Sequence, residues 1–503
     1  MKIALIHYHL RPGGVTQVML RQARALQEGG DEALALSGEP PPDPAEWEGV
    51  NRAVIPALCY DRRPPGDPRP GGSGGRFGPE TGIQAAELAR SIEEAIRSRW
   101  PGGAGLILVH NPLIRKNSLL MGALKELARR GPLLLQNHDL AEDFRPDVYS
   151  GEDYPENCHY AVINSRDRRF LLEAGLRDEG LHLIPNEVRS LAFTPGLPKT
   201  RYLYPVRGIR RKNIGEMLLL SLFIPGGSAG GGHSGPGPAA TVALTQPPTT
   251  DQDAPIYRRW QALAAELALP AEFEAGALPG RGGGSASFAD VVGTARAAIT
   301  TSVKEGFGFS FLEPWTAGLA VTGRRLDYVC RDFEEAGLRF EPFYGALRIP
   351  AEYAEPERLR KKMELVLSGV YAAFGAALPP SISPALDRVF DGGDYLDFGI
   401  MDEETQEGIL RRAAADKTVR GRIAGANPFL EALESWESDP ALVEANRRAV
   451  MAVYSRERIG TILRESCRKA LTPIVQRISR PRLLELYLDP ARLSLTGVSP
   501  ERP

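Results

Sequence analysis

The sequence predicts an α/β protein with two doubly wound domains. Its 503 residues exceed what a single hydrophobic core normally organises. Short apolar segments alternate with amphipathic ones, as in parallel sheets that are covered by helices. The alternation restarts after residues 195–198, a Pro-Gly-Leu-Pro segment that is typical of a hinge. We therefore expect a first domain over residues 1–195 and a second over residues 199–455.

The first domain should open with a strand, a glycine turn and a helix. Residues 2–6 are apolar after Lys2 and too few for a signal peptide, so they predict a buried strand. Gly13 and Gly14 follow, and apolar side chains then recur at helical spacing over residues 15–27. Further strands are expected at 106–109, 133–135, 160–163 and 182–185, and further helices at 118–130 and at 166–173, the last with Ser165 as N-cap. Several of these strands end in polar groups, and parallel sheets bind ligands at the carboxyl ends of their strands.

The second domain repeats the pattern. Strands are expected at 201–206, 241–244 and 297–301, and helices at 214–224 and 255–269. Asn213 is a candidate N-cap, with Glu216 three residues further on. An amphipathic helix within residues 456–480 is expected to pack back on the first domain. Residues 64–82 and 226–238 are so rich in Gly, Pro and Ser that they predict flexible insertions.

Composition excludes some classes of partner. A formal net charge of −2 offers no basic surplus for nucleic-acid phosphates, so we expect no nucleic-acid partner. No apolar run is long enough to predict a transmembrane segment, whereas peripheral membrane contact through an amphipathic helix stays open. The four cysteines form neither a metal-binding pair nor a disulfide framework, which is typical of a reducing compartment. The sequence therefore indicates a cytoplasmic protein.

The most informative stretch is residues 302–314, after an expected strand and at the start of an expected helix. Glu305 and Glu313 lie eight positions apart around a turn that contains Gly306 and Gly308. Glycines let backbone N–H groups approach a ligand, and a helix that begins near Ser310 would direct its positive dipole end at a diphosphate. Glu313, expected in the first helical turn, would then accept hydrogen bonds from ribose hydroxyls. The alternative is that Glu313 only complements the helix dipole.

A second stretch crowds cations into one strand-to-helix turn, with Arg207, Arg210, Arg211 and Lys212. Cations are unfavourable at a helix N-terminus unless an anion lies there, because that end of the helix already carries positive partial charge. The conflict favours a phosphate site, and the alternative is a solvated basic turn.

These two stretches and the Gly13-Gly14 turn resemble the retaining nucleotide-sugar glycosyltransferases of the GT-B fold, in the large family four group. The family's two glutamates, separated by seven residues, match Glu305 and Glu313. The resemblance implies two Rossmann-like domains that face each other across a cleft. It also implies that Arg207 and Lys212 bind the donor diphosphate, with Arg210 as a competitor for the arginine role.

The same resemblance implies the remaining roles. Glu305 would hold sugar hydroxyls, and His138 would reach the donor sugar and steady the charge that develops on it; the alternative for His138 is a structural histidine at a strand end. The implied donor-binding residues are Gly13, Gly14, Gly306, Phe307, Gly308, Phe309, Ser310 and Glu313.

The expected activity is retaining transfer of a sugar from a nucleoside diphosphate sugar to an acceptor hydroxyl. No metal and no cofactor is expected, because the fixed cations would take the place of a divalent ion. The alternatives are a non-catalytic nucleotide-sugar sensor or scaffold of the same fold, and a disaccharide synthase or phosphorylase-like enzyme. The sugar, the nucleotide and the acceptor stay open.

Overall fold

The computed structural model describes residues 1–61, 79–225, 240–277, 287–341, 343–390, 393–434 and 439–498. The chain forms two compact units. Unit 1 contains Met1–Glu187, Gly369–Ala377 and Tyr454–Asp489, and unit 2 contains Val188–Ser368, Leu378–Val453 and Pro490–Pro503. The expected boundary at 195–198 therefore falls inside unit 2.

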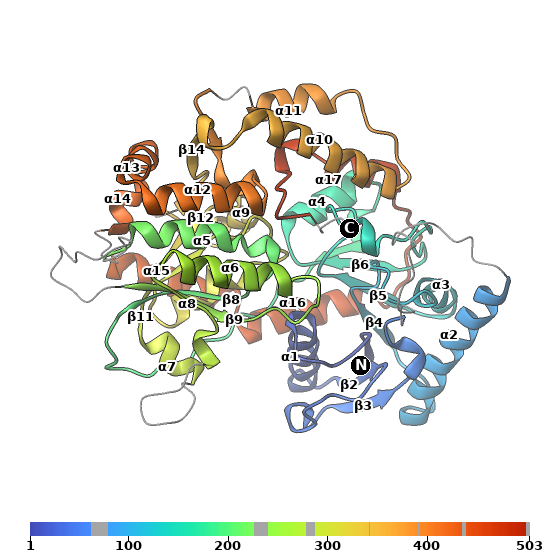
Figure 1. Ribbon diagram of the computed structural model, residues 1–503. Coiled ribbons are helices and arrows are strands. Elements are labelled where there is room, and N and C mark those ends of the chain that lie inside the picture. The colour runs from blue at the N-terminus through green and yellow to red at the C-terminus, as the bar shows by residue number, and fades with distance from the viewer. Residues whose placement is uncertain are drawn as a thin grey trace. The chain divides into compact units, whose positions relative to one another are not determined.

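Unit 1 is built on a seven-stranded parallel sheet in the order β3-β2-β1-β4-β5-β6-β7. Figure 1 labels β2 to β6 of this sheet. The strands are β1 (Lys2–Ile6), β2 (Glu32–Ser37), β3 (Asn51–Val54), β4 (Leu106–His110), β5 (Leu133–Asn137), β6 (His159–Val162) and β7 (Leu181–Leu183). The order reverses between β1 and β4, and such a reversal is where doubly wound sheets open a site at the carboxyl ends of their strands.

Helices cover both faces of the unit 1 sheet. They are α1 (Gly14–Glu28), α2 (Pro79–Arg99), α3 (Leu120–Arg130), α4 (Ser165–Glu173), α16 (Arg456–Lys469) and α17 (Arg480–Tyr487). Alternate residues of β1 point to opposite faces, so Ala4 and Ile6 enter a core with α2, α3, α4 and α17. Ile3 and Leu5 enter a second core with α1 and α16. Helix α16, which lies within the segment 456–480, thus packs against α1 within unit 1.

Unit 2 contains a six-stranded parallel sheet in the order β10-β9-β8-β11-β12-β13. Its strands are β8 (Arg201–Arg207), β9 (Thr241–Gln246), β10 (Ala271–Glu272), β11 (Ala295–Thr300), β12 (Val321–Arg324) and β13 (Phe343–Tyr344), and β14 (Arg348–Pro350) pairs antiparallel with β15 (Tyr395–Asp397). The order reverses between β8 and β11, as it does between β1 and β4 in unit 1. The predicted α/β class with two doubly wound sheets is confirmed.

The helices of the second half complete unit 2. They are α5 (Ile214–Leu220), α6 (Ala254–Glu266), α7 (Phe288–Gly293), α8 (Phe309–Thr316), α9 (Asp327–Glu335), α10 (Pro356–Ala373), α11 (Ile382–Phe390), α12 (Glu403–Ala415), α13 (Lys417–Ala426), α14 (Phe429–Glu434) and α15 (Pro440–Val453). The last residues of α10, from Gly369 onward, are assigned to unit 1. In the part of the chain that the structure describes, no helix is both long and apolar enough to cross a membrane.

Several predicted caps and helix limits are wrong. Asn164, not Ser165, caps α4, because its Oδ1 accepts a hydrogen bond of 2.8 Å from the amide of Asp167. The helix expected over 214–224 ends at Leu220 and continues as a short 3₁₀ turn. Glu313 is not in the first turn of its helix, because α8 starts at Phe309.

The two predicted insertions fall largely outside the described residues. This applies to 64–78 and to all of 226–238, whereas residues 79–82 form the start of α2.

Candidate active site

The predicted diphosphate residues of unit 2 gather where β8 and β11 end. Arg207 is the last residue of β8, and the turn with Lys212 follows it directly. Glu305 lies five residues beyond the end of the neighbouring strand β11. This is the point at which the strand order reverses, so both turns open on the same edge of the sheet.

Lys212 and Glu305 form a buried ion pair. The Nζ atom of Lys212 contacts Oε1 of Glu305, and the two side chains are 11% and 7% exposed. The hydroxyl of Ser302 donates a hydrogen bond of 2.7 Å to the same carboxylate oxygen. Burial raises the pKa of Glu305, but the positive charges of Lys212 and Arg211 outweigh it and leave the pKa below its usual value. Glu305 is therefore a buried carboxylate that stays ionised.

The backbone of the Lys212 turn is held from both neighbouring strands. The Tyr204 hydroxyl, from β8, donates a hydrogen bond of 3.0 Å to the carbonyl of Lys212 and lies 2.7 Å from the Ser302 hydroxyl. The Thr301 hydroxyl, just after β11, donates to the same carbonyl at 3.0 Å. Neither supporting hydroxyl is predicted by a local pattern, since Tyr204 and Thr301 lie in segments whose sequence indicates only buried strands.

The two candidate arginines differ in their surroundings. The guanidinium of Arg210 is bonded to Glu403, with Nε–Oε1 at 2.5 Å and Nη2–Oε2 at 2.9 Å, and it also donates to the carbonyls of Leu495 and Val498. Arg207 makes no ion pair with any described residue, and its Nε is buried without a hydrogen-bond partner. Arg210 is thus engaged within the fold, whereas Arg207 has donors left for a ligand.

In the turn before α8, backbone conformation and close packing require a glycine at one position. Gly308 caps the helix with a φ of +96°, and a Cβ atom there would lie 2.9 Å from Cγ1 of Val329. Phe307 packs edge-on against Phe309, with ring centroids 5.1 Å apart. The Ser310 hydroxyl in the first turn is buried and has no hydrogen-bond partner among the described residues. The turn therefore places a hydroxyl without a partner among the described residues at the N-terminus of a helix.

The remaining predicted residues of this stretch lie beside that turn. Gly306 is half-buried between Glu305 and Phe307. Glu313 lies in the second turn of α8 and is also half-buried, and its carbonyl accepts a hydrogen bond of 2.6 Å from the Thr316 hydroxyl.

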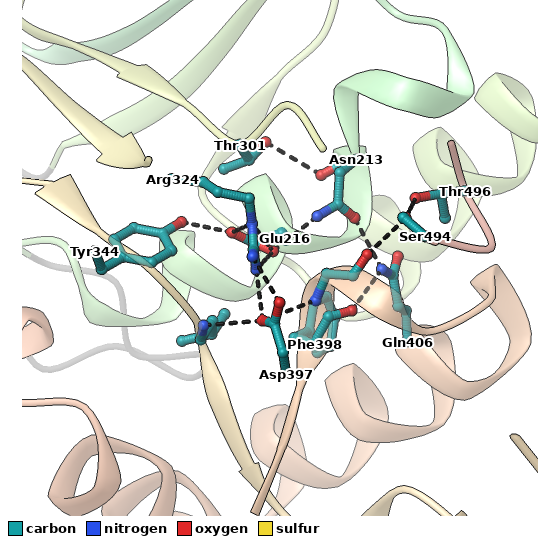
Figure 2. A network of polar contacts seen from close by, with 12 residues as sticks. Asn213, Glu216, Thr301, Arg324, Tyr344, Asp397, Phe398, Gln406, Ser494 and Thr496 are labelled. Atoms are coloured by element: carbon teal, nitrogen blue, oxygen red, sulfur yellow. Dashed lines mark hydrogen bonds and ion pairs between the residues drawn. The ribbon is translucent and has the colours of Figure 1, made fainter. Parts of the chain in front are cut away.

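A buried polar network adjoins the Lys212 turn, and no sequence pattern predicts it (Figure 2). Arg324, at the end of β12, lies between Glu216 of α5 and Asp397 of β15, with contacts of 2.6 Å and 2.7 Å. The Tyr344 hydroxyl, at the end of β13, donates to Glu216 at 2.6 Å. Asn213, next to Lys212, donates to Glu216 at 2.7 Å.

The side-chain cap that the sequence predicts for Asn213 does not form, because the network engages this side chain. Asn213 adopts a left-handed backbone conformation with a φ of +52°, and its side chain caps no amide of α5. Its amide nitrogen donates to Glu216 instead, and its oxygen accepts from Gln406 at 2.8 Å. The buried network thus fixes the residue that follows Lys212.

In unit 1, three histidines converge at the carboxyl ends of β1, β4 and β5. We call His7, His110 and His138 the histidine cluster. Nδ1 of His110 lies 3.0 Å from Nε2 of His138, and the rings stack with centroids 5.3 Å apart. Nδ1 of His7 lies 3.4 Å from the carbonyl oxygen of His110. Asn111 fixes the backbone of the cluster, because its Oδ1 accepts the amide N–H of His138 at 2.6 Å.

The histidine cluster is uncharged at neutral pH. Burial lowers the pKa of His138 to about 4, against a smaller opposing effect of Asp139. Burial also lowers the pKa of His7 to about 3, and the pKa of His110 well below its usual value.

Gly13 and Gly14 lie at the start of α1, also at the carboxyl edge of the unit 1 sheet. Gly13 is the N-cap residue, in an extended conformation, and no atom within 4 Å would meet a Cβ on Gly14. Neither backbone conformation nor crowding requires these two glycines. Over the described ranges, no group of three or more His, Cys, Asp or Glu side chains is arranged so that it could hold a metal ion.

Comparisons with known proteins agree with this architecture. No family model matches the sequence. The mannosylglucosyl-3-phosphoglycerate synthase of Petrotoga mobilis is 23% identical over 445 residues, which cover 80% of this chain and 79% of that protein.

Solved structures that match over nearly the whole chain include a sucrose-phosphate synthase and a glycosyltransferase. Sucrose-phosphate synthase from Thermosynechococcus elongatus has a TM-score of 0.50 at 16% identity, covering 92% of this chain and 97% of that one. A glycosyltransferase from Rickettsia africae has a TM-score of 0.50 at 11% identity, covering 93% and 98%. These likenesses confirm the fold class: two Rossmann-like domains of the GT-B type.

Proposed function

We propose that this protein is a glycosyltransferase that moves a sugar from a nucleoside diphosphate sugar to an acceptor hydroxyl. The observation that carries the proposal is the buried Lys212–Glu305 ion pair at the strand-order reversal of unit 2. Arg207 ends β8 at the same edge of the sheet, and its Nε has no hydrogen-bond partner among the described residues. The fold and the names of the similar proteins support the same class of activity.

Arg207 and Lys212 bind the donor diphosphate in this proposal. When the bond between the anomeric carbon and the diphosphate oxygen breaks, its electron pair leaves with the diphosphate. Two fixed cations and the amides of the first turn of α8 stabilise that negative charge, which is the largest contribution that such a site can make to the rate. The described contacts support Arg207 over Arg210 for this role, because Arg210 is already bonded to Glu403.

Glu305 holds hydroxyls of the donor sugar. Its Oε1 receives Lys212 and Ser302, whereas its Oε2 accepts no hydrogen bond from the described residues. A carboxylate that stays ionised accepts strong hydrogen bonds from hydroxyl groups. In unit 1, we propose that His138 contacts the sugar, and that the Gly13-Gly14 turn leaves room for the substrate.

The proposed reaction retains the configuration of the sugar and uses no metal. The acceptor oxygen forms its bond to the anomeric carbon on the face that the diphosphate leaves, and a diphosphate oxygen takes the acceptor proton. Arg207 and Lys212 supply the positive charge for which other enzymes use a divalent cation.

Nucleotide release during incubation with a panel of nucleoside diphosphate sugars tests the activity. Because the names of two similar proteins contain phosphoglycerate and sucrose phosphate, the acceptor panel should include phosphoglycerate and sugar phosphates. We expect turnover with one donor, and NMR of the product should show the anomeric configuration of that donor. Donor binding without turnover for any acceptor would instead indicate a nucleotide-sugar sensor.

The Lys212→Ala variant tests whether turnover depends on the proposed diphosphate site. Its turnover should fall about 100- to 1000-fold, as when one preorganised donor is removed from a charged transition state. Lys417→Ala is a matched control, because Lys417 is an exposed lysine at the start of α13 and should not affect the rate.

A further inference from the structure

Within the histidine cluster of unit 1, the contact between His110 and His138 admits only one proton. Nδ1 of His110 and Nε2 of His138 are 3.0 Å apart, so one ring donates and the other accepts. Both rings are neutral at pH 7, because burial lowers both pKa values. Each ring therefore carries a single N–H, and the question is which nitrogen holds it.

The other nitrogen of His110 decides this. Its Nε2 is buried and has no hydrogen-bond partner among the described residues. A buried N–H without an acceptor is rarer in proteins than a buried acceptor without a donor. Nε2 of His110 is therefore the unprotonated nitrogen, and Nδ1–H of His110 donates to His138.

The tautomer of His138 follows from that of His110. Since Nε2 of His138 accepts a hydrogen bond, its proton sits on Nδ1. Nδ1 of His138 meets no hydrogen-bond acceptor in the described ranges, so it has a donor available for a ligand.

We propose that His110 is a positioning residue that sets the tautomer of His138, so that His138 offers an N–H donor to an oxygen of the sugar substrate. The inference rests on the proposed function, and it changes one expectation drawn from the family resemblance. The positive end of a neutral N–H suits a hydroxyl or phosphate oxygen, whereas it would repel a developing oxocarbenium ion. His138 thus binds oxygen and does not stabilise positive charge.

A second histidine pair in unit 1 provides an internal reference. Nδ1 of His159 lies 2.9 Å from Nε2 of His182, and Nε2 of His159 lies 2.8 Å from the carbonyl oxygen of Thr472. A carbonyl only accepts, so His159 is protonated at Nε2 and must accept at Nδ1. His182 then also carries its proton on Nε2, which is the tautomer opposite to that proposed for His138.

Nitrogen-15 NMR of histidine-labelled protein tests the proposal without any substrate. We expect Nδ1 of His138 to be protonated at pH 7, while His159 and His182 show protonated Nε2. The signals are assigned by loss in His138→Gln and His159→Gln. If His138 shows a protonated Nε2, the proposal is wrong whether or not the protein is a glycosyltransferase.

Variants at His110 provide the functional test, with the fold of each checked by circular dichroism. His110→Leu removes the donor and should lower kcat about tenfold, the rate equivalent of one lost hydrogen bond, with His138 shifting towards a mixture of tautomers. His110→Asn places an amide N–H near the position of Nδ1 and should restore both kcat and the tautomer. His159→Gln should leave kcat unchanged. A His110→Leu variant with unaltered tautomer and rate would overturn the proposal.

Discussion

Replacing Arg324 with methionine should destabilise unit 2 strongly, because two carboxylates would lose their shared cation. The Arg324 side chain is 5% exposed, and it contacts the fully buried Glu216 and the partly buried Asp397. Removing one partner of a buried ion pair typically costs about 3–5 kcal/mol, since the remaining charge stays buried. We expect a loss of about that size in the free energy of unfolding at pH 7.

The pH dependence of the same variant identifies the cause. Burial raises the pKa of Glu216, and without Arg324 nothing of comparable strength would oppose that rise. A carboxyl whose pKa is higher in the folded state destabilises the protein as the pH rises above the pKa of the unfolded chain. The free energy of unfolding of Arg324→Met should therefore rise as the pH is lowered from 7 to 5.

Hydrogen exchange of the amides in β11 and β12, measured by mass spectrometry, reports the stability of unit 2 separately. The double variant Glu216→Gln/Arg324→Met serves as the control, because it removes the buried charge as well as its partner, and it should be more stable at pH 7 than Arg324→Met alone. A single variant within about 1 kcal/mol of the wild type would refute the reasoning, since an exposed ion pair contributes no more than that.

Two further predictions concern single residues. The pKa of His138 falls from 6.5 to about 4 on folding, so between these values the unfolded chain binds a proton that the folded protein does not. The stability that depends on neutral His138 is therefore complete above pH 6.5 and is lost as the pH falls towards 4. About 2 kcal/mol should disappear by pH 5, and urea unfolding of His138→Gln should show a correspondingly weaker pH dependence. Gly308→Ala should cost about 1–3 kcal/mol through its left-handed φ and the contact with Val329, and it should weaken nucleotide binding because it displaces the first turn of α8. Unchanged thermal unfolding and unchanged nucleotide affinity in Gly308→Ala would contradict that view of the turn.

Local patterns were sufficient to predict much of the fold. The strand-turn-helix alternation predicts two doubly wound sheets, and the rule that ligands bind where strand order reverses directs attention to the ends of β8 and β11. Lys212 and Glu305 were singled out from separate motifs, and the structure places them in contact although 93 residues separate them.

Features that depend on distant contacts could not be predicted. Arg324 meets Glu216 across 108 residues and Asp397 across 73, and no local period encodes such a pairing. For the same reason Asn213 was predicted as a helix cap, since its bond to Gln406 depends on tertiary structure. The role of His110 follows from one buried ring nitrogen, which a sequence does not reveal.

Calorimetric titration with nucleoside diphosphates tests the central claim most directly, because it requires no acceptor. UDP, GDP, ADP, CDP and dTDP are titrated into the wild type, Lys212→Ala, Arg207→Gln and Lys417→Ala. We predict that at least one nucleotide binds the wild type, that Lys212→Ala and Arg207→Gln each weaken this binding at least about tenfold, as expected for a lost charged hydrogen bond, and that Lys417→Ala binds normally. If no nucleotide binds, or if Lys212→Ala binds as tightly as the wild type, unit 2 does not hold a diphosphate at this site.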